Sequence, residues 1–471
     1  MDKKVVTRFA PSPTGFMHVG NVRAALYAWL WARKNNGTFI LRIEDTDKER
    51  EVKGSIEHIQ ESLKWLGLNW DEGPVIGGPH TPYIQSERLD IYKKYAQILI
   101  EKGCAYPDPY TEDEVDEFRK KAELEKRPFL YREHRPENFD IWDGTKPLRF
   151  KVPEVKVFKW HDMVFGDLSA GVEALDDFIL IKTDGYPTYN FAHIVDDIEM
   201  NVTHVMRGEE FISSTPKFLS VYEALNIKPP IYAYFPHIMA PGGNKKLGKR
   251  DGAKDILDYK KEGYLPEAMI NFLALLGWHP SNDKEIFSRE ELIKVFEIER
   301  IQKSGAQMSV DKLDWINKEH IKKLSKEELE KNIFEYLPEN YRNSKLVPVI
   351  VERISKWGDI KELLGAGELD FFFKQIEIQK EKLVYKNTTI EKTNNNLMLA
   401  IKSLEELNED NFTVENIKQA LMQIANGLEN RGELLHPVRY ALSGRDKSPD
   451  PFIIASIIGK NETLSRLQKA I

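Results

Sequence analysis

The first 66 residues alternate between strand and helix patterns, and this alternation constrains the fold more than any other feature of the chain. Residues 4–10 and 38–43 are typical of strands, and residues 19–34 and 56–66 carry apolar side chains at helical spacing. Gly37 is placed to end the first of these helices. This order favours a parallel α/β sheet. Such sheets bind their ligands at the carboxyl ends of the strands.

Two segments far apart in the chain have the residues that hold a triphosphate. Residues 8–21 lead from the first predicted strand into the first predicted helix, where unpaired amides attract phosphate. Gly15 and Gly20 allow close backbone approach, and His18 is placed to donate to a phosphate oxygen. The second segment, 245–252, carries four cations within six residues, which suits a pyrophosphate leaving group.

Composition limits the compartment and the metal chemistry. A single cysteine, Cys104, excludes an internal disulfide and a zinc site built from several cysteines, and it fits a reducing cytosol. No run approaches the roughly 20 apolar residues of a membrane span, and no signal-peptide pattern precedes the first strand, so we expect neither. The net charge of −7 neither indicates nor excludes a polyanion partner, because local patches decide such binding.

The alternation breaks near residue 84, where charged, proline-rich sequence begins. We interpret this stretch as a domain inserted into the nucleotide-binding fold, because α/β patterns resume near residue 191 and the two phosphate-binding segments lie on either side of it. Helical periodicity dominates from residue 326, with polar linkers such as 387–396. The predicted domains are 1–83 with 191–254, 84–190, 255–325 and 326–471.

Six motifs, taken in order, resemble bacterial glutamyl-tRNA synthetase over nearly the whole chain. They are Arg-Phe-Ala-Pro-Ser-Pro-Thr-Gly-x-x-His-Val-Gly at 8–20, Leu-Arg-Ile-Glu-Asp-Thr-Asp at 41–47, Gln-Ser-Glu-Arg at 85–88, Asp-Gly-Tyr-Pro-Thr-Tyr at 184–189, Lys-Leu-Gly-Lys-Arg at 246–250 and Pro-Val-Arg-Tyr-Ala-Leu-Ser-Gly at 437–444. The resemblance implies a class I aminoacyl-tRNA synthetase. Its fold would be a split Rossmann-like parallel-sheet catalytic domain with an inserted α+β domain, then a helical stem-contact region and all-α anticodon-binding domains.

The resemblance also implies the reaction and the partners. L-Glutamate and ATP, with Mg²⁺, would give glutamyl-adenylate, and the glutamyl group would pass to the 3′ end of tRNA(Glu). In this family adenylation usually requires bound tRNA. We expect a cytoplasmic monomer without zinc, because only Cys104 remains of the several cysteines that hold a structural zinc in some relatives.

Individual roles follow from the resemblance. The catalytic residues would be His18, Lys246 and Lys249. The ATP-binding residues would be His18, Gly20, Asn21, Glu210, Lys246, Leu247 and Lys249, with Gly248 where the mobile lysine loop usually has Ser. The glutamate-binding residues would be Arg8, Ala10, Ser12, Glu44, Tyr189, His193 and Arg207, with Arg8 on the side-chain carboxylate and Glu44 on the ammonium group. The tRNA-binding residues would be Arg431, Arg439, Arg445 and Lys447.

Two of these residues have a structural interpretation that stays open. Arg207 can form an ion pair with Glu209 or Glu210, and His193 can be a buried histidine beside Asp196 and Asp197. The tryptophans at 278, 315 and 357 are more typical of a core than of base stacking.

Four functional alternatives also stay open. A non-discriminating enzyme would charge tRNA(Gln) as well, and the difference depends on the helix near 347–357, which has one arginine, Arg353. An enzyme that glutamylates a modified nucleoside would lack the region after 326. A glutaminyl enzyme would carry β-barrels there, and a catalytically idle RNA-binding protein would not need both phosphate-binding segments.

Overall fold

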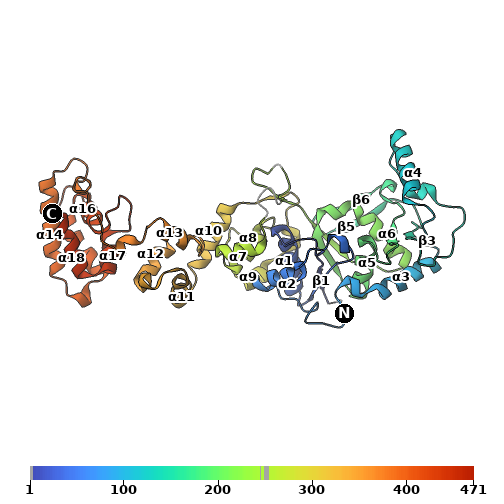
Figure 1. The fold of residues 1–471 in the computed structure, drawn as a ribbon, viewed down its shortest axis with the longest axis horizontal. Helices are drawn as coiled ribbons and strands as arrows, with labels where there is room; N and C mark the ends of the chain where they lie inside the picture. The colour runs from blue at the N-terminus through green and yellow to red at the C-terminus, as the bar shows by residue number, and fades with distance from the viewer. Residues whose placement is uncertain (1–3, 244, 249–253) are drawn as a thin grey trace. The chain divides into compact units, whose positions relative to one another are not determined.

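The computed structural model describes residues 4–243, 245–248 and 254–471, and it divides into two compact units, Met1–Asn317 and Lys318–Ile471 (Figure 1). Lys249 and Arg250, which the sequence places in the lysine loop, lie outside the described residues. No helix in the described ranges is both long and apolar enough to cross a membrane.

Parallel strands form the centre of the first unit. β1 (Val6–Phe9) pairs in parallel with β2 (Thr38–Leu41), and α1 (Val19–Lys34) connects them. β8 (His204–Gly208) pairs in parallel with β9 (Ile231–Phe235). The predicted parallel α/β sheet is therefore confirmed.

The two strand pairs meet where β1 lies beside β8. The amide of Thr203 donates to the carbonyl of Val6 over 2.9 Å, and the amide of Val6 donates to Oγ1 of Thr203 over 2.8 Å. Segments on either side of the predicted insert therefore lie side by side, joined at the amino-terminal ends of β1 and β8.

The bounds of α1 match the prediction, but its end differs in detail. Asn36, not Gly37, takes the left-handed conformation, with φ +49°. The amide of Gly37 donates to the carbonyl of Ala32 over 2.7 Å, which completes a Schellman-type end. Gly37 is needed for another reason, because a Cβ there would lie 2.4 Å from the carbonyl oxygen of Val5. Gly37 therefore takes part in the predicted end of α1, but Asn36 supplies the left-handed conformation expected of the glycine.

A hairpin from the middle of the chain extends the same sheet. β5 (Phe158–Asp162) pairs with β6 (Gly166–Ala170) and meets β9 in parallel at Tyr232. The buried carboxylate of Asp162 accepts the amide of Tyr234 over 2.9 Å. Part of the segment predicted as an insert thus contributes to the sheet of β8 and β9.

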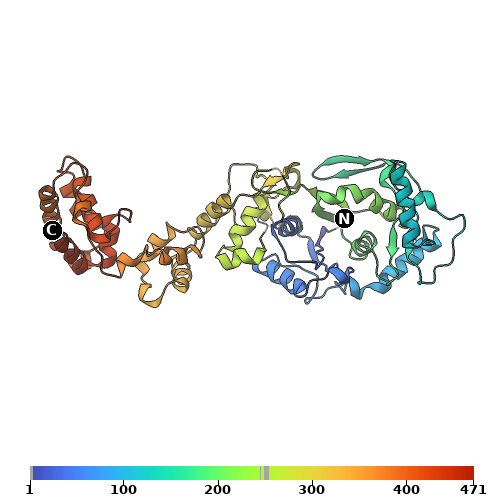
Figure 2. The same ribbon diagram turned by 45° about the horizontal axis from the view of Figure 1, so that its top comes forward.

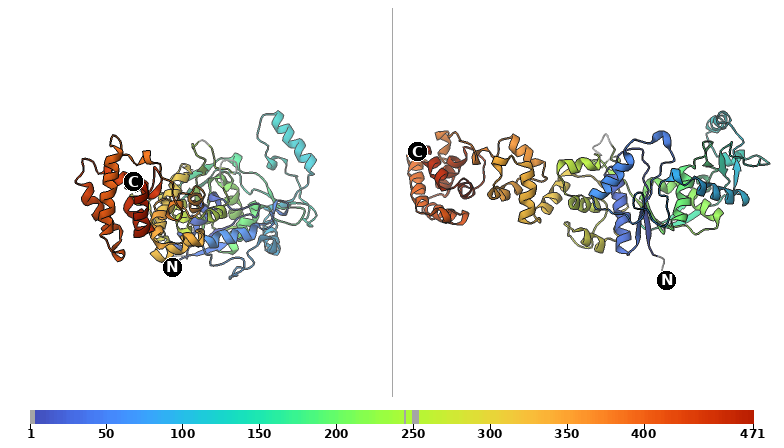
Figure 3. Two further views of the ribbon diagram at one scale, coloured as in Figure 1. Left: turned by 60° about the vertical axis from the view of Figure 1, so that its left-hand side comes forward. Right: turned by 60° about the horizontal axis from the view of Figure 1, so that its bottom comes forward.

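The rest of that segment forms a small antiparallel sheet with helices around it. Its strands are β3 (Ala105–Pro107), β4 (Leu148–Phe150) and β7 (Ile179–Ile181), and its helices are α3 (Leu89–Glu101) and α4 (Glu112–Leu124). The left-hand view of Figure 3 shows α4 projecting from the rest of the first unit.

The remaining elements of the first unit flank these sheets. They are α2 (Ser55–Trp65), α5 (Tyr189–Glu199), α6 (Thr215–Leu225), β10 (Ile238–Met239), α7 (Ile256–Glu262), α8 (Pro266–Leu275), α9 (Arg289–Val295), β11 (Ala306–Gln307) and α10 (Val310–Ile321), the last of which runs past the boundary between the units. Trp278 is fully buried in this unit's core, as predicted, whereas Trp315 is 39% exposed.

The described residues of the second unit form helices and no strand, which confirms the helical prediction. The helices are α11 (Lys326–Tyr336), α12 (Val347–Val351), α13 (Asp359–Gly365), α14 (Ile390–Glu405), α15 (Val414–Ala425), α16 (Gly432–Ser443), α17 (Pro451–Ile458) and α18 (Lys460–Ala470). Figure 2 shows α14 to α18 packed into one bundle.

One predicted linker of this unit is helical instead. Residues 387–396 run into α14, whose first turn is capped by the hydroxyl of Thr389 accepting the amide of Lys392 over 3.2 Å. Asn396 is buried, and its amide donates to the carbonyl of Glu433 over 3.1 Å. The polar sequence is therefore helical because a cap and a buried partner satisfy its polar groups.

Candidate active site

A pocket of about 390 Å³ opens at the carboxyl ends of β1, β8 and β9. It receives side chains from the segment before and within α1, from the end of β8, and from the segment after β9. The predicted site residues that line it are Arg8, Ala10, Ser12, His18, Gly20, Asn21, Glu44, Tyr189, Arg207, Glu210, Lys246 and Leu247. Distant parts of the chain therefore converge, as the sequence predicts.

His18 caps the start of α1 at this pocket. Its Nδ1 accepts the amide of Gly20 over 3.1 Å, and the side chain of Asn21 accepts the amide of His18 over 3.4 Å. Because Nδ1 accepts, Nε2 carries the proton of the neutral ring and is a donor. A Cβ on residue 20 would lie 3.0 Å from Cε1 of His18 and would crowd the ring, so this position of the imidazole favours glycine at residue 20.

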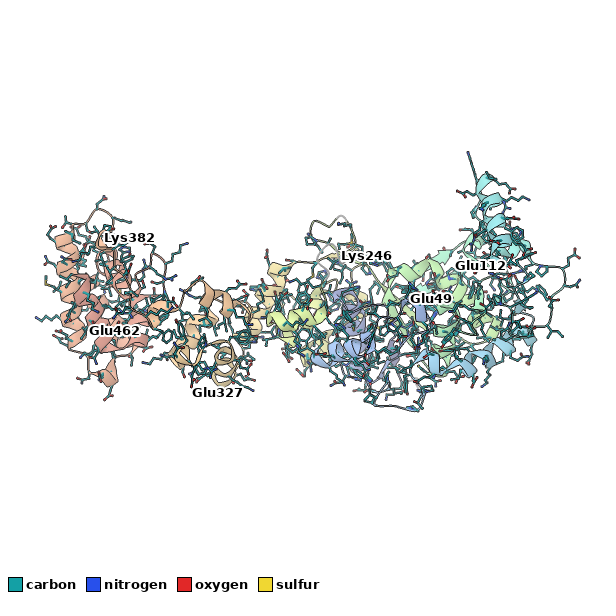
Figure 4. The ribbon with its side chains drawn as sticks, in the orientation of Figure 1. Glu49, Glu112, Lys246, Glu327, Lys382 and Glu462 are labelled. Atoms are coloured by element: carbon teal, nitrogen blue, oxygen red, sulfur yellow. The ribbon has the colours of Figure 1, made fainter. Side chains whose placement is uncertain are left out.

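Lys246, which is labelled in Figure 4, lines the pocket and follows β10 in the chain. Met239 and Lys246 form an antiparallel bridge, and the amide of Leu247 donates to the carbonyl of Ile238 over 2.8 Å. β10 also pairs in parallel with β11, so the hairpin is anchored to the first unit. Lys246 thus lines the same pocket as the segment that leads into α1.

An ion-pair network supports the floor of the pocket. The segment after β2 continues alongside the segment after β1, because the amide of Arg42 donates to the carbonyl of Phe9 over 3.0 Å. Helix α5 brings its own charged side chains to the same place. The network joins the guanidinium groups of Arg8, Arg42 and Arg88 to the carboxylates of Asp196, Asp197 and Glu44.

Asp197 is the centre of this network. Arg8 donates to its two oxygens over 3.1 and 3.3 Å, and Arg42 donates to Oδ1 over 2.8 Å. Burial raises the pKa of Asp197, but the two guanidinium groups outweigh it and hold the pKa well below its usual range. Asp197 is therefore ionised, and it holds Arg8 at the pocket wall.

Glu44 lies at the pocket with one oxygen already occupied. Its Oε1 accepts Nη2 of Arg42 over 2.9 Å. Burial raises the pKa of Glu44, and Arg42 only partly offsets this effect. A cationic group in the pocket would therefore stabilise the ionised form of this carboxylate.

Arg207 differs from the other buried arginines of the pocket floor because it makes no ion pair with a described carboxylate. Its Nη1 donates to the hydroxyl of Tyr189 over 3.0 Å, whereas its Nε and Nη2 have no hydrogen-bond partner among the residues that the structure describes. The guanidinium lies over Phe211 and Phe218, 4.5 and 4.8 Å from the ring centroids. The ion pair with Glu209 or Glu210 that the sequence left open is not formed.

Glu209 and Glu210 face His237 instead. Oε1 of Glu209 accepts the amide of His237 over 2.8 Å. Nδ1 of His237 lies 3.7 Å from Oε2 of Glu210. Glu210 therefore stays at the pocket on the side where the segment after β9 begins.

His193 is not among the residues that line the pocket. Its ring stacks on Tyr189 with centroids 4.7 Å apart, and its Nδ1 donates to the carbonyl of Tyr189 over 2.7 Å. Burial, helped by the nearby charge of Arg207, holds the pKa of His193 well below its ordinary value, so the ring is neutral. Its predicted contact with glutamate stays a prediction.

Arg23 lines the pocket, but the sequence analysis did not single it out. It lies on the buried face of α1, and its Nη1 donates to the carbonyl of Leu276 over 2.9 Å. Its Nη2 donates to the carbonyl of Pro236. The signal available in the sequence was a lone arginine among apolar residues of a buried helix, which requires a polar partner.

The predicted tRNA-binding residues lie in or beside α16 of the second unit. Arg439 donates to the hydroxyl of Ser448 over 3.1 Å, and Arg445 donates to the carbonyl of Gly367 over 2.6 Å. Arg431 and Lys447 are exposed. Arg439 and Arg445 therefore also stabilise the fold of this unit.

A groove of about 810 Å³ lies elsewhere in the second unit. It is lined by apolar side chains, including Val349 and Phe412, together with Lys345 and Arg353. Nη1 of Arg353 pairs with Glu368 over 2.8 Å. The single arginine that the sequence singled out near 347–357 thus borders a groove of mixed apolar and charged character.

The described ranges contain no group of three or more His, Cys, Asp or Glu side chains arranged to hold a metal ion. Cys104 is partly buried, which raises the pKa of its thiol. The expectation that the protein holds no zinc stays a prediction.

Comparison with known proteins identifies the class. The family model for the catalytic domain of class I tRNA synthetases of the E and Q type matches residues 4–315, and the model for an anticodon-binding domain matches residues 306–471. The pocket, with the turn at which His18 caps α1, lies within the first match. The fold is that of a class I aminoacyl-tRNA synthetase.

Full-length relatives narrow this to one family. A glutamate–tRNA ligase of Clostridium botulinum (strain Hall) is 44% identical over 486 residues, covering 100% of this chain and 99% of that protein. One of Clostridium kluyveri is 43% identical over 484 residues, covering 99% and 98%. The crystal structure of a glutamate tRNA ligase from Elizabethkingia meningosepticum in complex with its amino acid has a TM-score of 0.86 at 36% identity, covering 99% of each chain. The chain belongs to the glutamate–tRNA ligase family.

Proposed function

We propose that this protein activates L-glutamate with ATP and transfers it to the 3′ end of tRNA(Glu). An oxygen of the α-carboxylate attacks the α-phosphorus of ATP, and the bond to the β-phosphate breaks, which gives glutamyl-adenylate and pyrophosphate. A hydroxyl of the terminal ribose then attacks the acyl carbon, and AMP leaves. Membership of the glutamate–tRNA ligase family and the convergence of both phosphate-binding segments on one pocket support this proposal.

The buried guanidinium of Arg207, which has no carboxylate partner among the described residues, favours glutamate as the amino acid. Arg8, Arg42 and Arg88 already have carboxylate partners, and Arg23 donates to two backbone carbonyls. Arg207 has neither a carboxylate partner nor, at Nε and Nη2, any hydrogen-bond partner among the described residues. A buried cation without a counterion is costly, and a bound carboxylate offsets that cost through charge-assisted hydrogen bonds. Free glutamate has a net charge of −1, whereas the side chain of glutamine would leave Arg207 unpaired.

We assign the other groups of glutamate to neighbouring residues. Arg8 shares the side-chain carboxylate with Arg207, because both guanidinium groups line the same pocket. Glu44 accepts the ammonium group, which relieves the burial of its carboxylate. Ala10, Ser12 and Tyr189 complete the wall.

ATP binds on the α1 side of the pocket. Nε2 of His18 donates to a phosphate oxygen, and the absence of a side chain at Gly20 lets the adenosine approach the helix start. Lys246 and Lys249 neutralise the leaving pyrophosphate as its charge develops, and ATP brings Mg²⁺ as its counterion. Asn21, Glu210 and Leu247 contribute the remaining contacts.

The remaining parts of the chain bind tRNA. In this proposal the catalytic domain is a split Rossmann-like fold, the segment within 84–190 positions the acceptor end, residues 255–325 contact the stem, and the second unit binds the anticodon. Arg431, Arg439, Arg445 and Lys447 contribute phosphate contacts, which makes binding sensitive to salt. We propose that the protein acts as a monomer.

Charging of purified tRNA with radiolabelled glutamate tests the function. We expect charging of tRNA(Glu) and little charging of tRNA(Gln). Comparable charging of both would support the non-discriminating alternative, and Arg353, which borders the groove of the second unit, is then the first residue to vary. Absence of charging and of tRNA-dependent ATP–pyrophosphate exchange would contradict the proposal.

A further inference from the structure

His58, in α2, links three segments beside the phosphate-binding turn. Its side chain is 11% exposed, and its Nε2 lies 2.8 Å from each carboxylate oxygen of Asp255, which is 197 positions away in the sequence. On the other side of the ring, the amide of Met17 donates to Nδ1 over 3.5 Å. The ring of Phe16 stacks on it, with centroids 4.5 Å apart.

The partners of His58 define its hydrogen-bonding roles. An ionised carboxylate only accepts hydrogen bonds, so Nε2 carries a proton and donates to Asp255. The amide of Met17 only donates, so Nδ1 accepts. The 2.8 Å contacts with Asp255 are the shorter ones and dominate the interaction.

Asp255 in turn borders the backbone of His18. The two residues form an antiparallel bridge, and the amide of Ile256 donates to the carbonyl of Met17 over 2.9 Å. Oδ1 of Asp255 also caps α7 by accepting the amide of Leu257 over 2.9 Å. A side chain that fixes Asp255 therefore fixes the strand-like segment from which His18 reaches the pocket.

We propose that His58 is a positioning residue for ATP: through Asp255 it holds the backbone of Met17 and His18 so that the imidazole of His18 faces the triphosphate. This inference rests on the proposed function of the pocket. His58 does not line the pocket, so it acts on the reaction only through these neighbours.

Two replacements separate the contacts of His58. In His58→Gln the amide nitrogen occupies the place of Nε2 and still donates to Asp255. In His58→Asn the amide oxygen occupies the place of Nδ1 and still accepts from Met17, but no group reaches Asp255. Glu61→Gln is the matched control. Glu61 also joins α2 to α7, through an exposed ion pair with Lys260 over 3.1 Å, but this pair does not involve Asp255 or His18.

The test is steady-state ATP–pyrophosphate exchange with tRNA(Glu), with the Tm of each variant measured in parallel. We expect His58→Ala and His58→Asn to lower kcat/KM for ATP about tenfold, because a small misplacement of a phosphate-binding group is costly. The KM for glutamate should stay within about twofold of the wild type. His58→Gln should recover most of the loss, and Glu61→Gln should match the wild type.

A double-mutant cycle covers the case in which His58→Ala folds poorly. Asp255→Ser keeps a side-chain cap for α7 but is too short to reach His58. We expect it to reproduce the loss of His58→Ala, with no further loss in the double variant. Unchanged ATP kinetics in His58→Ala, equal losses for ATP and glutamate, or additive losses would overturn the inference. Absence of exchange in the wild type would instead contradict the proposed function.

Discussion

Arg207 donates a hydrogen bond from Nη1 to the hydroxyl of Tyr189 over 3.0 Å, while its other two nitrogens have no partner in the described part of the chain. Tyr189 thus orients the guanidinium without neutralising it. The guanidinium therefore keeps its positive charge and two donor nitrogens, with which the carboxylate of a ligand can pair.

Replacement of Arg207 by lysine should impair glutamate recognition selectively. Lysine keeps the charge but lacks the planar fork that grips a carboxylate with two bonds. Loss of one charge-assisted hydrogen bond, worth about 2–3 kcal/mol, predicts a rise of roughly 100-fold in the KM for glutamate. Steady-state kinetics with each substrate varied provide the check. Tyr189→Phe removes only the hydroxyl that orients Arg207, so it should raise the KM for glutamate less. Equal increases in the KM values for glutamate and ATP would argue against the proposed role of Arg207.

Replacement of Arg8 by alanine should affect both binding and stability. It removes a cation from the pocket, so affinity for glutamate should fall far more than affinity for ATP. It also leaves Asp197 with Arg42 as its remaining close cation, which should lower the free energy of unfolding by about 2 kcal/mol. Calorimetry with each ligand and urea unfolding measure the two effects. Equal losses of both ligands would exclude the assigned contact.

Lys249→Ala should slow adenylation with little change in glutamate binding. Neutralising charge on the leaving group lowers the barrier to the chemical step, so the loss should appear as about a 100-fold lower single-turnover rate. Lys254→Ala is a matched control, because Lys254 forms a surface ion pair with Glu262 over 2.6 Å. If Lys249→Ala retains the wild-type rate in rapid-quench measurements, the lysine has no catalytic role.

Part of the acid sensitivity of the fold should come from His193. In the folded protein its pKa lies well below the ordinary value, whereas in the unfolded chain it is about 6.5. Below pH 6.5 the unfolded state therefore takes up a proton that the folded state does not, and stability falls as pH falls. Above pH 6.5 this contribution is fully present.

His193→Asn should flatten this dependence. It removes a slope of at most about 1.4 kcal/mol per pH unit between pH 6.5 and the lower pKa of the folded state. Asn can still donate to the carbonyl of Tyr189. Urea unfolding at pH 5.5 and pH 7.5 gives the comparison, and other buried histidines, such as His204, contribute equally to both proteins. Parallel stability curves would show that His193 is not the group responsible.

The purified protein should contain no stoichiometric zinc, and treatment with a strong chelator should not change its Tm. The physical reason is the shortage of thiolates around Cys104. Metal analysis by mass spectrometry, together with thermal unfolding before and after chelation, checks this. One zinc per chain, or a chelator-dependent fall in Tm, would show that other side chains build a metal site.

The sequence predicted local elements well where one pattern decided them. Helix α1 has its predicted bounds because its apolar spacing and its cap agree. Its end was assigned to Gly37, since glycine is the usual residue there, but Asn36 takes the left-handed conformation and Gly37 is required by the nearby carbonyl of Val5. The local sequence could not show whether Gly37 was needed for a left-handed conformation or for close approach to another segment.

Relationships that depend on tertiary packing could not be predicted from the sequence. The contacts of Asp197 with Arg8 and Arg42 join three separate segments, and nothing in their local patterns specifies the pairing. The hairpin of β5 and β6 was assigned to an insert because proline and charge surround it, whereas its pairing with β9 adds it to the main sheet. Arg23 and His58 were missed for the same reason.

A crystal structure with a non-hydrolysable glutamyl-adenylate analogue tests the central claim most directly. The account predicts that the side-chain carboxylate of the analogue lies within hydrogen-bonding distance of Arg207, and that its phosphate mimic lies beside His18 in the same pocket. A carboxylate bound elsewhere, with Nε and Nη2 of Arg207 still unpaired, would contradict it.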